Sequence, residues 1–297
     1  MRVTSTAQFR HLRSRCLGHI VNLAAKAFLL GDDYDAFMDD VAVAEQATLR
    51  DEQLLAQEQA KWRSRGPIGK FHNIVVYIRR SPQRRQEFKA EIEGCIRRIE
   101  ARGETPDFTT DLTVILDNST RWNSTYRSIR RGLRLREPID SYLLHHNGPL
   151  NDDKLTDEDW AQLAEIAEAL EPFDHITLRL EGDGKSGTHG AIWEAITSLD
   201  YLLTNIERRQ RVLREQQEAQ QQQRQEAQQQ ETGRRRGRTS RRSTTPPTTQ
   251  VNPLLIAYQN AWQKLTEYNA LTDENHEIYA AGALLSPCLR RAYFEKR

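Results

Sequence analysis

The stretch Leu116-Asp-Asn-Ser-Thr-Arg-Trp-Asn-Ser-Thr-Tyr126 carries the densest structural signal in the chain. Turn-forming residues open it, and Ser119 or Thr120 can cap a helix that follows. A helix is therefore predicted to begin at Trp122 and to run toward Leu135. The same kind of signal, a cap followed by helical spacing of apolar residues, recurs through most of the sequence.

Arginines surround the apolar positions of this predicted helix. Its apolar marks are Ile129, Leu133 and Leu135, and the cations around them are Arg127, Arg130, Arg131, Arg134 and Arg136. The Arg121-Trp122 pair would stand at the helix N-terminus, where unpaired backbone amides favour anions. From these residues alone, Trp122 is expected to pack inward from a capped helix.

Helical periodicity extends over the rest of the chain. The segments that predict helices are 16–30, 35–62, 68–78, 82–99, 138–145, a segment capped at Thr156 with Asp159, 192–206, and the region from Pro253 onward. Gly31, Gly66-Pro67 and Pro172 are expected to end, separate or kink helices. Only residues 112–116 have strand character, and five residues do not make a sheet. The predicted fold class is all-α, an irregular helical array.

The composition limits the class of protein but does not indicate what this protein binds. The chain has 297 residues, 37% hydrophobic and 29% charged, with a formal net charge of +1. Its three cysteines lie far apart, which favours a reducing compartment over a disulfide framework. No apolar run is long enough to span a bilayer, and no secretory leader is visible, so we expect an intracellular, soluble protein without a membrane partner.

A low-complexity segment divides the sequence. Glutamine repeats, an arginine-rich run and a Thr-Thr-Pro-Pro-Thr-Thr end replace the apolar periodicity between residues 207 and 250. The expected organisation is a poorly ordered lead-in at 1–15, helical residues 16–206, a disordered insert at 207–252 that begins as a fraying helix, and helical residues 253–297.

Four blocks resemble the hAT family of DNA transposases, especially the fungal ones, and occur in the family's order. They are Cys16-Leu-Gly-His-Ile-Val-Asn-Leu23, Gly69-Lys-Phe-His-Asn-Ile-Val-Val-Tyr-Ile78, Thr120-Arg-Trp-Asn-Ser-Thr-Tyr126, and Ile278-Tyr-Ala-Ala-Gly-Ala-Leu-Leu-Ser-Pro287. The resemblance implies that the chain corresponds to the helical insertion domain of an RNase H-like transposase, with thin margins of the catalytic domain.

The resemblance also implies a site, partners and a location. The implied DNA contacts are His19, Arg121, Trp122, Asn123 and Arg127. The resemblance implies that Trp122 is an exposed face on which an unpaired base stacks, and the alternative is an anchor packed into the core. The implied partners are transposon-end DNA, bound weakly, and full-length transposase, in the nucleus. The implied function is that of a truncated, catalytically inactive transposase derivative that keeps DNA binding. The alternative is a helical interaction protein, or a decayed protein, with no DNA role.

Catalysis is not expected of this chain by itself. Family members cut DNA with three carboxylates that hold two magnesium ions, and the first two are aspartates that precede the Cys-x-x-His element. No acidic residue precedes Cys16, and Glu295 is a doubtful counterpart of the third. No catalytic residue is therefore assigned, and no cofactor is expected, since magnesium belongs to an intact parent enzyme.

Three other patterns are weak as sites. Cys16 and His19 share a helix face but lack the third and fourth ligands that zinc requires, so no metal ligand is assigned. The acidic residues of 32–40 are typical of caps and solvated faces, and the glycine-rich loop 182–187 lacks the Walker spacing. The basic run 234–242 is either a localisation or nucleic-acid tail or a solvated linker.

Overall fold

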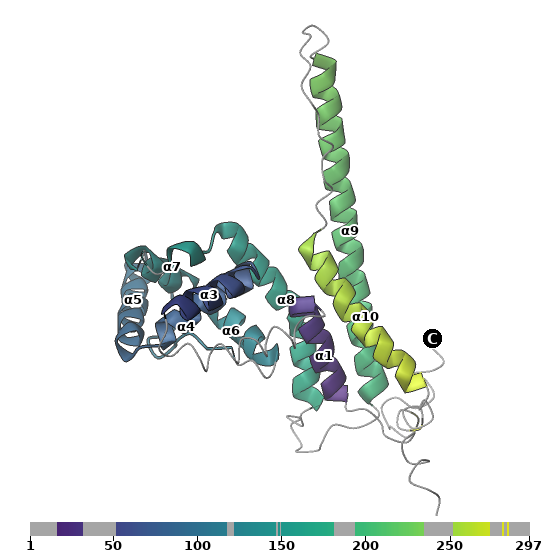
Figure 1. Ribbon diagram of the computed structural model, residues 1–297, viewed down its shortest axis with the longest axis horizontal. Helices are drawn as coiled ribbons and strands as arrows, with labels where there is room; N and C mark the ends of the chain where they lie inside the picture. Colours follow the sequence, from purple (N-terminus) through teal and green to yellow (C-terminus); the bar gives the residue numbers. More distant parts are fainter. Residues whose placement is uncertain are drawn as a thin grey trace, which may run out of the picture. The chain divides into compact units, whose positions relative to one another are not determined.

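The computed structural model describes residues 17–31, 52–117, 122–146, 148, 150–180, 194–234, 252–273, 281 and 284. Over these residues the regular elements are all helices and no strand occurs (Figure 1). Residues 112–116 are irregular. The predicted all-α class is confirmed. None of the described helices combines the length and the apolar character that crossing a bilayer requires.

The chain divides into two compact units. One comprises Asp32–Leu178, and the other combines Met1–Gly31 with Arg179–Arg297. We call them the 32–178 unit and the split unit. The domain organisation expected from the sequence, helical residues 16–206 and 253–297 around an insert at 207–252, stays a prediction. The two units are defined by contacts between segments that are distant in sequence. The amino-acid composition does not predict such contacts.

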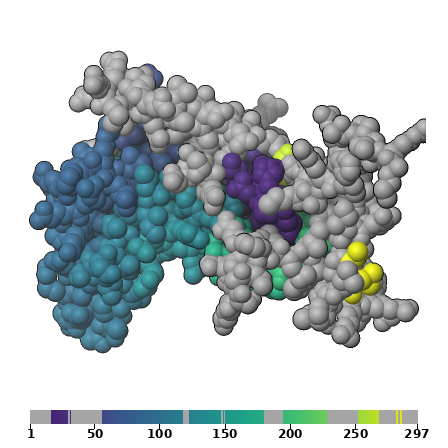
Figure 2. Space-filling view, turned by 90° about the horizontal axis from the view of Figure 1, so that it is seen from below, coloured from purple at the N-terminus to yellow at the C-terminus, as the bar shows by residue number. Residues whose placement is uncertain are grey.

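The 32–178 unit is built from short and medium helices. They are α3 (Glu52–Arg63), α4 (Pro67–Arg79), α5 (Pro82–Ala101), α6 (Trp122–Arg134), α7 (Arg136–His145), the 3-10 turn η4 (Asn151–Asp153), and α8 (Asp157–Leu180) up to Leu178. Figure 2 shows the blue and teal residues of this unit as contiguous atoms. Buried side chains from every one of its α-helices form the core, including Trp62, Ile74, Phe88, Ile129, Tyr142 and Leu163.

Local sequence signals fix where several of these helices begin. Gly66 adopts a positive φ of 68° and Pro67 is placed at the first turn of α4, as the Gly-Pro pair predicts. The α8 start is a capping box: the Thr156 amide donates to Asp159 at 3.0 Å, and the Asp159 amide donates to the Thr156 hydroxyl at 3.1 Å. Pro172 lies inside α8, which passes through it without being divided.

Two glycines allow helices to approach closely. A Cβ at Gly69 would lie 1.7 Å from the backbone oxygen of Trp62, so α4 can contact the end of α3 only because this position has no side chain. A Cβ at Gly132 would lie 2.3 Å from Cζ of Phe71, which is buried in α4. Gly132 thus lets the Phe71 ring pack directly against the backbone of α6.

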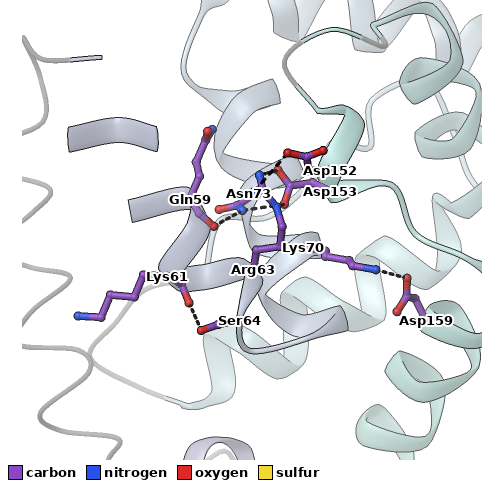
Figure 3. Close-up of polar contacts among 9 residues, drawn as sticks. All are labelled: Gln59, Lys61, Arg63, Ser64, Lys70, Asn73, Asp152, Asp153 and Asp159. Carbon is purple, nitrogen blue, oxygen red and sulfur yellow. Dashed lines mark hydrogen bonds and ion pairs between the residues drawn. The ribbon is translucent and has the colours of Figure 1, made fainter. Parts of the chain in front are cut away.

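A buried carboxylate ties η4 to α3 and α4 (Figure 3). Asp153 is fully buried and accepts hydrogen bonds from Arg63 Nε at 2.9 Å and from Asn73 Nδ2 at 2.9 Å. Nearby, Lys70 donates to Asp159 at 2.7 Å and so connects α4 to the start of α8. Because each buried charge has a charged or amide partner, these contacts offset the cost of desolvation and fix the connection before α8.

The split unit contains three described α-helices. They are α1 (Leu17–Leu30), α9 (Glu194–Arg234) and α10 (Pro253–Asp273), and α10 contacts both of the others. Phe28 of α1 meets Tyr258 of α10 edge-on, with ring centroids 5.1 Å apart. Figure 1 shows α9 continuing as a single helix well past the end of α10.

The predicted insert at 207–252 begins as helix, since α9 continues to Arg234. Residues 235–251 lie outside the described residues, so disorder there stays a prediction. The lead-in 1–15, the acidic residues 32–40 and the glycine-rich loop 182–187 also lie outside them. Of the long helix predicted for 35–62, the structure describes the part from Glu52 onward as α3.

Candidate nucleic-acid interface

Helix α6 is amphipathic, with an aromatic face buried and a basic face outside. Trp122, Tyr126 and Ile129 are 1%, 7% and 1% exposed, respectively. The helix carries no acidic residue, and its cations recur at spacings of three and four. We call Arg127, Arg130, Arg131 and Arg134 the arginine face. The local sequence alone sets this arrangement, because a period of 3.6 places these residues within about 100° of one another.

An irregular segment, residues 104–117, crosses α6 and α4. We call it the strap. Its core anchors are Phe108 and Val114, at 4% and 0% exposure. Side chains donate hydrogen bonds to four of its backbone carbonyls. The donors are Arg134 to Asp107, Arg131 to Thr113 at 2.9 Å, Arg79 to Val114 at 2.9 Å, and Ser128 to Ile115 at 2.6 Å. These four carbonyls are thereby paired without a partner strand.

A buried histidine–aspartate contact holds the end of the strap that leads into α6. Asp117 lies 2.6 Å from Nδ1 of His72, and both side chains are almost fully buried. The His72 ring stacks on Trp62 with centroids 3.6 Å apart and planes 15° apart. The chain therefore reaches the residues before Trp122 from a fixed point on α4.

The strap divides the arginine face into two pairs. Arg131 and Arg134 each give part of their donors to strap carbonyls. Arg127 and Arg130 are exposed, and neither forms an ion pair within the part of the chain that the structure describes. Of the arginine face, Arg127 and Arg130 are thus the guanidinium groups that are available to an external anion.

A groove of about 630 Å³ runs between α6 and the strap. Its lining consists of the arginine face together with Asp107, Ile115, Tyr126 and Leu133. Four cations thus face one carboxylate. Burial raises the pKa of the Tyr126 phenol, and the nearby Arg130 guanidinium opposes that rise. The phenol therefore stays neutral at physiological pH, so the charge of the groove comes from its four arginines and from Asp107.

The structure favours the core interpretation of Trp122. The indole is 1% exposed, tilted against Tyr126 at a centroid distance of 6.1 Å and edge-on to Phe173 of α8 at 6.1 Å. A base could not stack on this ring without opening the core. The expectation of an exposed stacking platform at Trp122 is therefore wrong for this conformation. The apolar spacing of α6 brings the ring inward.

The other predicted DNA contacts belong to different units or lie outside the described residues. His19 is exposed on α1 and belongs to the split unit, whereas Asn123 and Arg127 belong to the 32–178 unit. Asn123 is 8% exposed, which leaves little of it for a ligand. Arg121 lies outside the described residues. Arg130 is exposed on the same helix face as Arg127 but was not among the predicted contacts, although its three-residue spacing from Arg127 was a usable signal.

Metal ligation finds no support in the described residues. No group of three His, Cys, Asp or Glu side chains there is arranged to hold a metal ion. The histidines at the end of α7 pair with α5 instead: His145 lies 2.7 Å from Glu91 and His146 lies 3.2 Å from Glu87. Cys95 of α5 is buried next to Arg98, and burial raises the pKa of its thiol, so it is unsuited to ligation.

A second groove, of about 750 Å³, lies on the other side of Arg134 and Asp107. Its cations and acids are mixed, and Arg102 lies within 4 Å of Glu104 and of Glu137. Leu144 lines it and is 68% exposed. Because its charges are internally paired, this groove has no strong preference for an anion.

Comparison with known proteins assigns the family. A sequence profile of the ZBED1 RNase-like helical domain matches residues 14–169, which cover α1 and most of the 32–178 unit. The chain belongs to this family. Membership supports the resemblance to hAT transposases at the level of a transposase-derived helical domain, of ZBED or hAT type. The arginine face and the strap both lie inside the matched residues.

A curated relative extends the comparison. A protein of Talaromyces stipitatus named "Putative transcriptional regulator tpeD" is 26% identical over 200 residues, which are 67% of this chain and 21% of that protein. The chain spans about a fifth of the length of this relative. No solved structure matches the chain.

Proposed function

We propose that this transposase-derived chain binds DNA through the phosphate backbone, by means of the arginine face of α6. The observation that carries the proposal is the pair Arg127 and Arg130, exposed on one helix face and without a carboxylate partner in the described residues. A guanidinium binds phosphate through two parallel hydrogen bonds, and it is protonated at any physiological pH. Backbone contacts of this kind supply affinity without reading sequence.

The strap supports this role by fixing the helix. Arg131 and Arg134 hold the strap carbonyls, and His72 holds its end through Asp117. The arginine face is therefore a rigid surface. Binding would therefore cost the conformational entropy of two arginine side chains, and no backbone segment would have to become ordered.

Salt-dependent DNA binding tests the proposal. Arg127→Ala/Arg130→Ala should weaken binding to duplex DNA and reduce the slope of log K against log salt by about two, one for each phosphate that is no longer neutralised. The measurement is fluorescence anisotropy of a labelled duplex over a series of salt concentrations. Circular dichroism and thermal melting should show an unchanged fold, because both side chains are exposed.

Arg80→Ala/Arg97→Ala is the matched control. Both residues are exposed in the same unit, and the pair removes the same charge away from the groove. This control should keep the slope of the parent. Equal weakening in the two double variants would mean that net charge alone acts, and an unchanged slope in the Arg127/Arg130 variant would reject the proposed surface.

We further propose that this chain does not cut DNA by itself and acts only by binding. The name of the Talaromyces stipitatus relative describes a transcriptional regulator, and a bound, non-cleaving protein fits such a role. Nuclear location and association with full-length transposase belong to the same proposal.

A protein-interaction role without DNA is the second candidate. The second groove favours it: Leu144, 68% exposed, lines this groove together with Ile99, Phe108 and Leu133, and grouped apolar side chains on a surface mark protein contacts. The salt series also separates the two roles, because a protein with no DNA role shows no salt-dependent affinity for duplex DNA.

A further inference from the structure

The groove beside α6 combines positive charge, which a phosphate backbone requires, with apolar surface, which it does not. One wall carries the exposed guanidinium groups of Arg127 and Arg130. The lining also holds three apolar or aromatic side chains, Ile115 from the strap and Tyr126 and Leu133 from α6. Ile115 and Leu133 are half-buried, so each keeps apolar surface in contact with solvent.

Duplex and single-stranded DNA would use this lining differently. A duplex presents phosphates and sugars to a helix face and keeps its bases stacked inside. The apolar side chains of the groove would therefore contact no base of a duplex. A single strand exposes the faces of its bases, and these faces bury well against apolar and aromatic side chains. A positive groove with an apolar lining is therefore better matched to unpaired DNA.

We propose that the groove between α6 and the strap takes a short single-stranded DNA segment. This inference rests on the proposed function and adds the class of nucleic acid. Phosphates lie on Arg127 and Arg130, and one base packs against Ile115 and Leu133. The charge excess of the groove, four arginines to the single carboxylate of Asp107, suits a polyanion.

The dimensions limit the segment to a few nucleotides. Arg127 and Arg134 are separated by about 10 Å along the helix axis, at 1.5 Å per residue. Arg134 donates to the Asp107 carbonyl, and the two residues close this end of the groove. The Asp107 carboxylate repels phosphate there, so the backbone is held at the Arg127 end.

Binding of the full chain to an oligothymidine and to a duplex of equal length tests the inference. The apolar variant is Ile115→Ser/Leu133→Ser, which changes no charge, and its control is Ile256→Ser, an exposed apolar position in α10. The apolar variant should lose about fivefold of its affinity for the single strand and none for the duplex. The control should match the parent with both probes.

The outcomes separate this inference from the proposed function. If the apolar variant binds the single strand as the parent does, or weakens both probes equally, the inference fails and duplex binding through arginine stands. If Arg127→Ala/Arg130→Ala leaves both probes unaffected, the proposed function itself fails. If an acidic peptide displaces the single strand as well as free oligothymidine does, the groove recognises charge only and the inference also fails.

Photocrosslinking gives a second readout that does not depend on a folded variant. An oligonucleotide with a single 5-iodouracil, which crosslinks mainly to aromatic side chains, should label the tryptic peptide that contains Tyr126 when it is irradiated with the parent chain. Labels confined to peptides outside α6 and the strap would overturn the inference.

Discussion

The indole of Trp122 meets the ring of Phe173 edge-on, with centroids 6.1 Å apart and planes at 72°. This contact joins α6 to α8, and both rings are buried. Trp122→Ala should therefore cost about 3–5 kcal/mol of unfolding free energy, because it removes buried apolar surface and leaves a cavity behind. Urea denaturation followed by circular dichroism measures it.

Tyr201→Ala serves as the control, because Tyr201 is 49% exposed on α9. It should change stability by no more than about 0.5 kcal/mol. A Trp122→Ala protein with the stability of the parent would show that the ring is not a core anchor, and would reopen the stacking interpretation.

Gly132→Ala should destabilise the protein although alanine favours helices. The added methyl would lie 2.3 Å from Phe71 Cζ in a closed core, and overpacking of this kind costs about 1–3 kcal/mol. Gly94→Ala is a matched change inside α5, where the nearest atom is the flexible end of Arg98 at 3.4 Å. Gly94→Ala should be neutral or stabilising, by up to about 1 kcal/mol. Equal effects of the two changes in thermal melting would contradict the packing argument.

Stability should fall in acid partly through Asp159. Burial alone would raise the pKa of this carboxyl, but hydrogen bonds from Lys70 and from the Thr156 amide outweigh burial and hold the pKa below its ordinary value of 3.8. The unfolded chain then binds the proton more tightly, so the stabilisation is complete well above pH 3.8 and is lost as the pH falls through the lowered value.

Asp159→Asn should cost about 1 kcal/mol at neutral pH, the usual size of a capping contribution. The stability difference between parent and variant should shrink below pH 3.8. Urea midpoints at a series of pH values give both numbers. A difference that stays constant into acid would show that the Asp159 carboxylate is not the titrating group.

No metal-dependent cleavage of DNA is expected of this 297-residue chain. This expectation belongs to the proposal that the chain acts by binding DNA and not by cutting it. Magnesium or manganese with supercoiled plasmid provides the assay. Nicking that persists through purification and disappears when one acidic residue is replaced would refute the expectation.

Local chemistry was enough to predict much of the fold. Some features depend only on residues a few positions apart, so they can be predicted from the sequence. They are the Gly66-Pro67 pair, the Thr156–Asp159 capping box and the apolar spacing of α4 and α6. The placement of the arginines on one face of α6 is of the same kind. Helix α9 continues further than its loss of apolar spacing suggested, since glutamine, glutamate and arginine favour helix without needing a core.

Tertiary contacts decided what periodicity could not. Whether Trp122 is a core anchor or a platform depended on Phe173, which comes from another helix. Which arginines are available depended on the strap, whose carbonyls occupy Arg131 and Arg134 and leave Arg127 and Arg130 exposed. Sequence spacing fixes the direction of a side chain around its own helix, but the partner that covers it is brought there by the chain's path through space.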